Sequence, residues 1–170
     1  MHSSSYRLMA AAVERWAGDL PRPRRVLDVG SLDVNGTYKA LFAGDHYTGC
    51  DLTPGPNVDV VVPEPYRLPF VDGQFHLVVS GQTLEHSPQP WRLLREMARV
   101  TAPGGYVIAI NPSTGPAHMT PDCYRFLPDG MRGLAEWAGL TVVCAGVLPG
   151  GTWSDCLAVM RRPVTRGAAQ

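Results

Sequence analysis

The chain has 170 residues, of which 45% are hydrophobic and 18% are charged, so the composition predicts one folded domain rather than a disordered chain. Fifteen basic residues balance fifteen acidic residues, which argues against a nucleic acid as the main partner. No apolar run is long enough to span a membrane, and residues 1–6 lack the apolar core of a signal peptide. We therefore expect no membrane association and a cytoplasmic location.

Apolar periodicity and the positions of proline and glycine predict helices and strands that alternate along the chain. Helices are expected at 6–16, 37–43, 87–100 and 129–138, and strands at 24–29, 47–51, 58–62, 76–80, 106–110, 141–148 and 156–161. The last two strands would form a closing antiparallel hairpin around 149–151. Such alternation predicts a Rossmann-like, doubly wound α/β fold with a mostly parallel sheet and helices on both faces. We expect a single domain over 1–170, with an N-terminal helix and linker (1–23), a core (24–161) and a tail (162–170).

The four cysteines form no CxxC pair, so we expect buried thiols, with neither a disulfide framework nor a zinc site. They are Cys50, Cys123, Cys144 and Cys156.

The first candidate site is the glycine turn after the first strand, in the segment VLDVGSLDVNG at 26–36. Gly30 allows a ligand to approach the backbone closely, and Asp28 and Asp33 place two carboxylates nearby. These carboxylates would repel a pyrophosphate but suit a ligand with a cationic end. An ordinary strand-to-helix turn also contains glycine and aspartate, and this remains the alternative.

Two further groups of residues follow the second and third predicted strands. Asp51 lies about twenty residues after the glycine turn, where a carboxylate accepts hydrogen bonds from ribose hydroxyls; a loop or helix-capping aspartate is the alternative. Glu64 would accept from an exocyclic amine, and Tyr66 or Leu52 would pack on an adenine ring, unless this proline-rich segment is only a surface loop.

Three segments together resemble the class I S-adenosylmethionine-dependent methyltransferases, in particular the type 11 group. VLDVGSLDVNG resembles the family's VLDxGxGxG, although Leu32-Asp33 and Val34 replace its second and third glycines. LPFVDGQFHLVVSGQTLEH resembles the family's LPF…FD…LEH stretch, with His76 where aspartate is usual, and LLREMARVTAPGGYVIAINP resembles its E..RVLKPGG segment.

This resemblance implies a seven-stranded sheet with its last strand antiparallel, and S-adenosylmethionine as the cofactor. By the resemblance, Asp28, Gly30 and Ser31 would lie along the methionine part, Asp51 would hold the ribose, Glu64 and Pro65 would contact adenine, and Ser80 and Gly81 would border the sulfonium. The complete set of expected cofactor-binding residues is Asp28, Gly30, Ser31, Asp33, Gly36, Asp51, Leu52, Glu64, Pro65, Tyr66, Ser80, Gly81 and Gln82.

The expected reaction is in-line methyl transfer to oxygen or nitrogen of a small-molecule acceptor, such as a sugar or a natural product. Candidate catalytic residues follow the fourth and fifth strands: His86, and His118, Asp122 and Tyr124 in the proline-rich loop 112–128. Packing or helix capping is the alternative for His86, and anchoring of the loop is the alternative for Tyr124. Because we expect no inserted cap domain, we expect an open pocket, a bulky acceptor, or a homodimer in which the second copy completes the site.

Three other readings stay open. A nicotinamide-dependent oxidoreductase would use the same glycine turn and Asp51, but GxGxxG is missing. A catalytically degenerate binding or partner subunit would keep the fold without turnover. Metal-assisted transfer would use His118 and Asp122 as ligands, but their spacing gives no metal signature, and we expect no metal.

Overall fold

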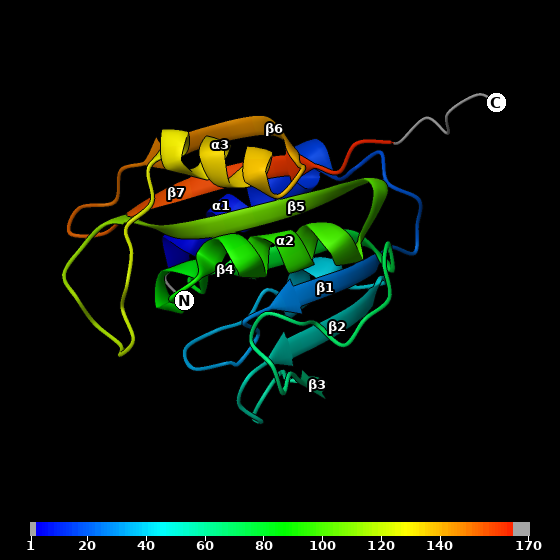
Figure 1. Cartoon of the computed structure of the whole chain (residues 1–170), viewed down its shortest axis with the longest axis horizontal. Helices are drawn as coiled ribbons and strands as arrows, with labels where there is room; N and C mark the ends of the chain where they lie inside the picture. The colour runs from blue at the N-terminus through cyan, green and yellow to red at the C-terminus, as the bar shows by residue number, and fades with distance from the viewer. Residues whose placement is uncertain (1–2, 165–170) are drawn as a thin grey trace.

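A seven-stranded sheet in the order β3-β2-β1-β4-β5-β7-β6 runs through the computed structural model, which describes residues 3–164 (Figure 1). Its strands are β1 (Arg25–Val29), β2 (His46–Asp51), β3 (Val60–Val61), β4 (Phe75–Gly81), β5 (Thr101–Thr114), β6 (Thr141–Leu148) and β7 (Ser154–Arg161). The described helices are α1 (Ser3–Trp16), α2 (Pro90–Val100) and α3 (Pro128–Trp137), with 3-10 turns η1 (Lys39–Phe42) and η2 (Leu84–His86).

The strands from β3 to β5 pair in parallel, whereas β7 is antiparallel to both β5 and β6. The Rossmann-like, mostly parallel seven-stranded sheet and its antiparallel C-terminal hairpin are therefore confirmed. The chain passes from β1 outward to β2 and later returns to β4 on the other side of β1. This reversal is a topological switch point, and a parallel sheet offers a ligand crevice there, beyond the carboxyl ends of β1 and β4.

Side chains of the central strands alternate between two apolar layers, because successive residues of a strand point to opposite faces. Leu27 and Val78 face the layer that α2 and α3 cover, with Met97 and Met131 packed on them. Val26, Leu77 and Val79 face the opposite layer, which α1 and η1 cover (Figure 1). Burial on both faces explains why β1 and β4 read as nearly continuous apolar runs.

Several predicted boundaries were wrong, and longer-range pairing explains most of them. The expected helix at 37–43 is only the single turn η1, and the expected strand at 58–62 pairs only over Val60–Val61. The fifth strand is much longer than 106–110, because its second half is held by β7, a partner distant in sequence.

The start of α2 was also predicted wrongly. Ser87 follows the turn η2 instead of capping α2, whose N-cap is Gln89 and whose first residue is Pro90. The Ser87 hydroxyl donates instead to the hydroxyl of Tyr66, at 3.4 Å.

All four cysteines are free, and Cys50 and Cys156 are buried as expected. Cys144 is half-buried, whereas Cys123 is exposed because it lies on the surface loop between β5 and α3. Within 3–164, every helix is too short or too polar to cross a bilayer. The predicted tail lies outside the described residues from 165 onward.

Candidate functional site

A cavity of about 150 Å³ opens beyond the carboxyl ends of β1 and β4, at the switch point of the sheet. It is formed by the turn after β1, by the end of β4, by η2 and by the loop after β5. Its lining residues are Asp28, Gly30, Ser31, Leu32, Val34, Asn35, Gly36, Thr37, Tyr38, Gly81, Gln82, His86, His118 and Met119. We call it the switch-point cavity.

Asp28 brings a buried carboxyl group to this cavity, since only 3% of the residue is exposed. The hydroxyl of Tyr47 donates a hydrogen bond of 2.7 Å to Asp28 Oδ2, and Asn57 Nδ2 donates in turn to that hydroxyl. Burial raises the pKa of Asp28 to about 7, against the lowering effect of the Tyr47 hydrogen bond; the charge of Asp51 adds to the rise. The carboxyl therefore gains or loses its proton near neutral pH.

The glycine turn is fixed by backbone geometry at Gly30, whose φ of +79° is a conformation that favours glycine. A Cβ on Gly30 would lie 2.1 Å from the Thr83 hydroxyl, so the turn after β1 packs directly on the turn after β4. Ser31 donates to the Asn57 carbonyl at 2.9 Å, whereas Asp33 accepts from the Gly36 amide at 2.7 Å and closes the loop. Asp33 does not line the cavity, but the other predicted residues of this turn do.

Asp51 stands at the end of β2, beside the glycine turn. Its two carboxylate oxygens accept from the amides of Leu32 (3.2 Å) and Thr53 (3.1 Å). These bonds fix the carboxylate and leave lone pairs for further donors. Leu52 follows with 56% of its surface exposed, so both residues lie at the rim and outside the cavity lining.

Gly81 and Gln82 form the β4 side of the switch-point cavity. The Gln82 side chain is fixed by a 2.9 Å hydrogen bond from its Nε2 to Asp155 Oδ1. Ser80 is fully buried, and its hydroxyl donates to the Val29 carbonyl at 2.8 Å. Ser80 therefore ties β4 to β1 and does not line the cavity.

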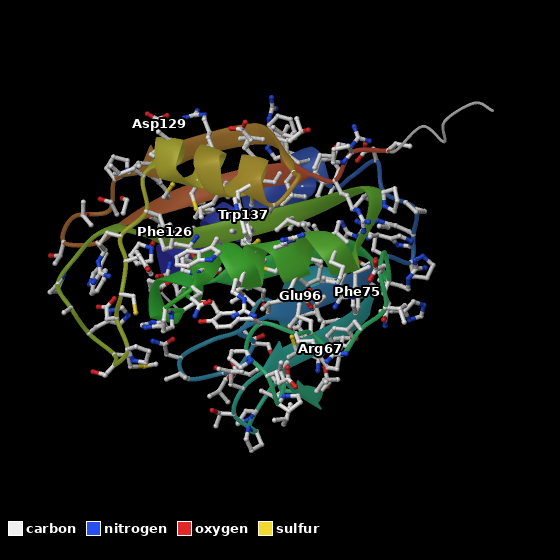
Figure 2. The ribbon with its side chains drawn as sticks, viewed as in Figure 1. Arg67, Phe75, Glu96, Phe126, Asp129 and Trp137 are labelled. Carbon is white, nitrogen blue, oxygen red and sulfur yellow. The ribbon has the colours of Figure 1, made fainter. Side chains whose placement is uncertain are left out.

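Glu64, Pro65 and Tyr66 line a different hollow, an open surface cavity of about 860 Å³ between residues 64–71 and α2. The Tyr66 hydroxyl accepts from the Gln89 amide at 3.1 Å, and the Arg92 guanidinium lies 4.8 Å from the ring centre. Figure 2 labels Arg67 and Glu96 beside this hollow. The structure thus separates the three residues expected at adenine from the lining of the switch-point cavity.

The two candidate histidines meet at the cavity although they are 32 residues apart in the chain. The rings of His86 and His118 contact edge to face, with centres 4.9 Å apart. His86 Nδ1 lies 2.6 Å from the Pro121 carbonyl oxygen, and His118 Nδ1 lies 3.1 Å from Asp122 Oδ2.

The other two candidates of this loop make hydrogen bonds to neighbouring residues. Asp122 accepts from the guanidinium of Arg125 at 2.6 and 2.9 Å, and these hydrogen bonds hold the pKa of Asp122 well below its usual range. Tyr124 donates to the Pro88 carbonyl at 3.0 Å and is not in the cavity lining. Phe126, labelled in Figure 2, is buried in the core and anchors this end of the loop.

Sequence reasoning missed one functional candidate, Glu85. Its side chain is fully buried, and among residues 3–164 neither carboxylate oxygen has a hydrogen-bond partner. Burial raises the pKa of Glu85 to about 8, partly offset by its own backbone amide and by the charge of Arg125. The signal that the sequence offers is an acidic residue between apolar Leu84 and the candidate His86.

No lysine or arginine is among the described residues that line the switch-point cavity, whereas a carboxyl group is. The site therefore favours a ligand with a cationic group and disfavours a pyrophosphate. The carboxyl group of Asp28 thus disfavours a nicotinamide dinucleotide, as the sequence of the glycine turn predicts.

The chain is similar in sequence to known methyltransferases. Residues 27–109 match the model of a family described as a methyltransferase domain. An uncharacterized methyltransferase from Mycobacterium leprae is 37% identical over 127 residues, which cover 61% of this chain and 45% of the relative. The chain thus spans about half the length of the curated relatives it matches.

Solved structures share the fold at low identity. A Burkholderia thailandensis 1,6-didemethyltoxoflavin-N1-methyltransferase, solved with bound 1,6-didemethyltoxoflavin and S-adenosylhomocysteine, aligns with a TM-score of 0.76 and 21% identity over 94% of this chain and 79% of that one. The cyclase SpnF aligns with a TM-score of 0.74 and 17% identity over 94% of this chain and 81% of that one. The same fold therefore carries two kinds of chemistry among these neighbours.

Proposed function

Since the chain belongs with the class I S-adenosylmethionine-dependent methyltransferases, we propose that it transfers a methyl group from this cofactor to a small-molecule acceptor. The observation that carries the proposal is the switch-point cavity, with the buried carboxyl of Asp28 inside it and the fixed carboxylate of Asp51 at its rim. S-adenosylmethionine would supply a methyl group on a cationic sulfur, which is transferred by in-line displacement.

The residues of the switch-point cavity fit this cofactor. Asp28 would attract the positive charge of the methionine part, and the backbone at Gly30 and Gly81 would lie against it without intervening side chains. Asp51 would accept from the ribose hydroxyls. The enclosed volume of about 150 Å³ is below the ~300 Å³ of typical ligand sites, so the rest of the cofactor would lie along the exposed rim near Leu52.

The adenine ring has candidate neighbours in Leu52 and in the segment after β3. Glu64, Pro65 and Tyr66 match the family's adenine position by sequence, yet they line the other hollow. We propose that adenine lies between Leu52 and the segment after β3, where Glu64 is exposed.

The acceptor would enter from the side of His86 and His118, which line the cavity. Orientation of acceptor, methyl and sulfur in one line can lower the barrier by about 7–11 kcal/mol without further chemistry. If the acceptor keeps its proton at neutral pH, either histidine can serve as the general base. Nitrogen or oxygen as the target atom, a homodimer and a cytoplasmic location remain parts of the proposal.

The test is calorimetric titration of the purified protein with S-adenosylhomocysteine, with NADH as the control ligand. S-adenosylhomocysteine alone should bind, and Asp51→Ala should weaken it by about tenfold or more because a charged hydrogen-bond acceptor is lost. Asp129→Ala is the matched control, since Asp129 is an exposed aspartate on α3 (Figure 2). NADH binding, or unchanged affinity in Asp51→Ala, would contradict the proposal.

A cofactor-binding subunit that transfers no methyl group is the second candidate, because the neighbour named as a cyclase has this fold but carries the name of a different reaction. Methyl uptake by a panel of acceptors separates the two. Cofactor binding with no transfer to any acceptor would favour the second candidate.

A further inference from the structure

We propose that Glu85, His86 and His118 form a binding site for a divalent transition-metal ion at the edge of the switch-point cavity. Each residue offers one ligand atom, and these atoms all lie within 4.8 Å of one another. The set joins the turn η2 after β4 to the loop after β5. Two histidines and one carboxylate are a common ligand set for Zn²⁺ and for Fe²⁺.

The hydrogen bonds of both histidines leave a ring nitrogen free for a metal. His86 Nδ1 donates to the Pro121 carbonyl at 2.6 Å, and His118 Nδ1 donates to Asp122 Oδ2 at 3.1 Å. A donating Nδ1–H leaves Nε2 with its lone pair in each ring. Metal-binding histidines almost always donate their other ring N–H to a carbonyl or carboxylate in this way.

Glu85 gives the independent second observation. Its residue is 0% exposed, and both carboxylate oxygens lack a hydrogen-bond partner within the described structure. One of them, Oε1, lies 3.7 Å from His86 Nε2, too far for a hydrogen bond. At this separation one metal ion, about 2.0–2.2 Å from each ligand atom, can bind both atoms. A buried carboxyl without a partner is otherwise costly.

The charges around the cluster also favour a cation. Asp122 places a carboxylate beside the cluster, since it accepts from His118 Nδ1, and the guanidinium of Arg125 is hydrogen-bonded to the same carboxylate. The guanidinium of Arg125 is occupied by Asp122 and by the carbonyls of Gly115, Pro116 and Tyr124, and it makes no hydrogen bond to Glu85.

Burial falls across the three ligands from Glu85, which is buried, through half-buried His86 to exposed His118. The metal would therefore lie between the interior and solvent, with an entry path on the His118 side. Three protein ligands leave at least one open coordination position, as in catalytic rather than structural zinc sites. Both histidines line the switch-point cavity, so the open coordination position could activate the acceptor. That role rests on the proposed function, whereas metal binding itself does not.

The experiment is a calorimetric titration of chelator-treated protein with Zn²⁺, followed by the visible absorption spectrum after Co²⁺ is added. We expect one ion per chain and a Co²⁺ spectrum typical of nitrogen and oxygen ligands. Mg²⁺, which prefers oxygen ligands, should not compete. Glu85→Gln and His118→Gln should each weaken binding by about 10–100-fold or more, the range found when even a residue behind a ligand is lost.

Two controls keep the assignment of the ligands falsifiable. His46→Gln removes an exposed histidine at the start of β2 and should leave the affinity for Zn²⁺ unchanged. Cys123→Ser removes an exposed thiol near the cluster, since the backbone amide of Cys123 donates to the Glu85 carbonyl. This variant should also leave the affinity for Zn²⁺ unchanged. Absent Zn²⁺ binding, a loss caused by Cys123→Ser, or full affinity in Glu85→Gln would each overturn the proposal.

The titrations with Zn²⁺ and with S-adenosylhomocysteine are done separately, so the two proposals fail independently. Binding of S-adenosylhomocysteine without Zn²⁺ would overturn the metal site alone. Melting temperatures and circular dichroism of each variant confirm that a loss of binding is not a loss of fold.

Discussion

Asp28 should make cofactor affinity depend on pH in the neutral range. A carboxylate attracts a cationic amino group, whereas the neutral acid does not, so affinity should follow the ionised fraction of Asp28. With a pKa of about 7, that fraction rises from roughly one tenth at pH 6 to roughly nine tenths at pH 8. Since only the ionised form binds well, the apparent dissociation constant of S-adenosylhomocysteine should fall about tenfold across this range.

The assay is calorimetry at pH 6, 7 and 8. Asp28→Asn keeps an acceptor for the Tyr47 hydroxyl but never ionises, so it should bind weakly and equally at all three values. Asp129→Asn is the matched surface control and should keep the wild-type dependence. A wild-type affinity that is constant from pH 6 to 8, or a rise that survives in Asp28→Asn, would refute the reasoning.

The same pKa shift has the opposite sign for folding stability. The folded protein keeps the Asp28 proton up to about pH 7, whereas the unfolded chain releases it near 3.8. The folded state thus binds more protons between these values, and the resulting stabilisation is full below the lower value and lost as the pH rises to the higher one. Asp28→Asn should therefore raise the melting temperature at pH 8 but hardly at pH 4, with an upper limit of about 4 kcal/mol.

Two other predictions concern backbone strain and a buried ion pair. Gly30→Ala should destabilise the fold by about 1–3 kcal/mol, because residue 30 has a left-handed conformation and the new methyl group would clash with Thr83. Gly133→Ala should stabilise the fold by about 0.5–1 kcal/mol, because Gly133 lies within α3 with open space around its Cβ position. Denaturant titrations measure both free energies of unfolding, and equal effects would contradict the prediction. Asp45→Asn should cost about 3–5 kcal/mol at pH 7, because it leaves the buried guanidinium of Arg24 without its counter-charge. Burial alone would raise the pKa of Asp45, but the hydrogen bonds and charge of Arg24 outweigh burial and lower that pKa. The stabilisation by the ion pair should therefore disappear as the pH falls through the lowered pKa of Asp45. A melting temperature that does not respond to Asp45→Asn would show that the pair is not formed.

The sequence predicted the sheet well because its central strands are buried on both faces. The runs at 25–29 and 75–81 are so apolar that helix and turn are poor alternatives, and the turn at Gly30 marks where the first run ends. Local pattern was less informative at the edges. Residues 58–62 are as rich in valine as a true strand, yet only two of them pair.

The site was predictable where it depends on strand ends and unpredictable where it depends on loop packing. The approach of Asp28, Gly30, Gly81 and Gln82 follows from the order of parallel strands. The contact of His86 with His118 depends on the path of the loop after β5, which no periodicity encodes. Local rules therefore found each histidine as a candidate but could not predict that they meet beside Glu85.

The two outer strands of the sheet differ in how they resist pairing with another chain. At one edge β3 offers only two residues, and so short a ladder gives a foreign strand little to hold. At the other edge β6 offers eight residues, TVVCAGVL, with no charge and no proline to block addition. Self-association by strand addition at high concentration should therefore begin at β6, and a single lysine in place of Val143, which is 37% exposed, should suppress it in light scattering. The antiparallel hairpin at the C-terminal end of the sheet therefore leaves β6 as the edge more open to a further strand.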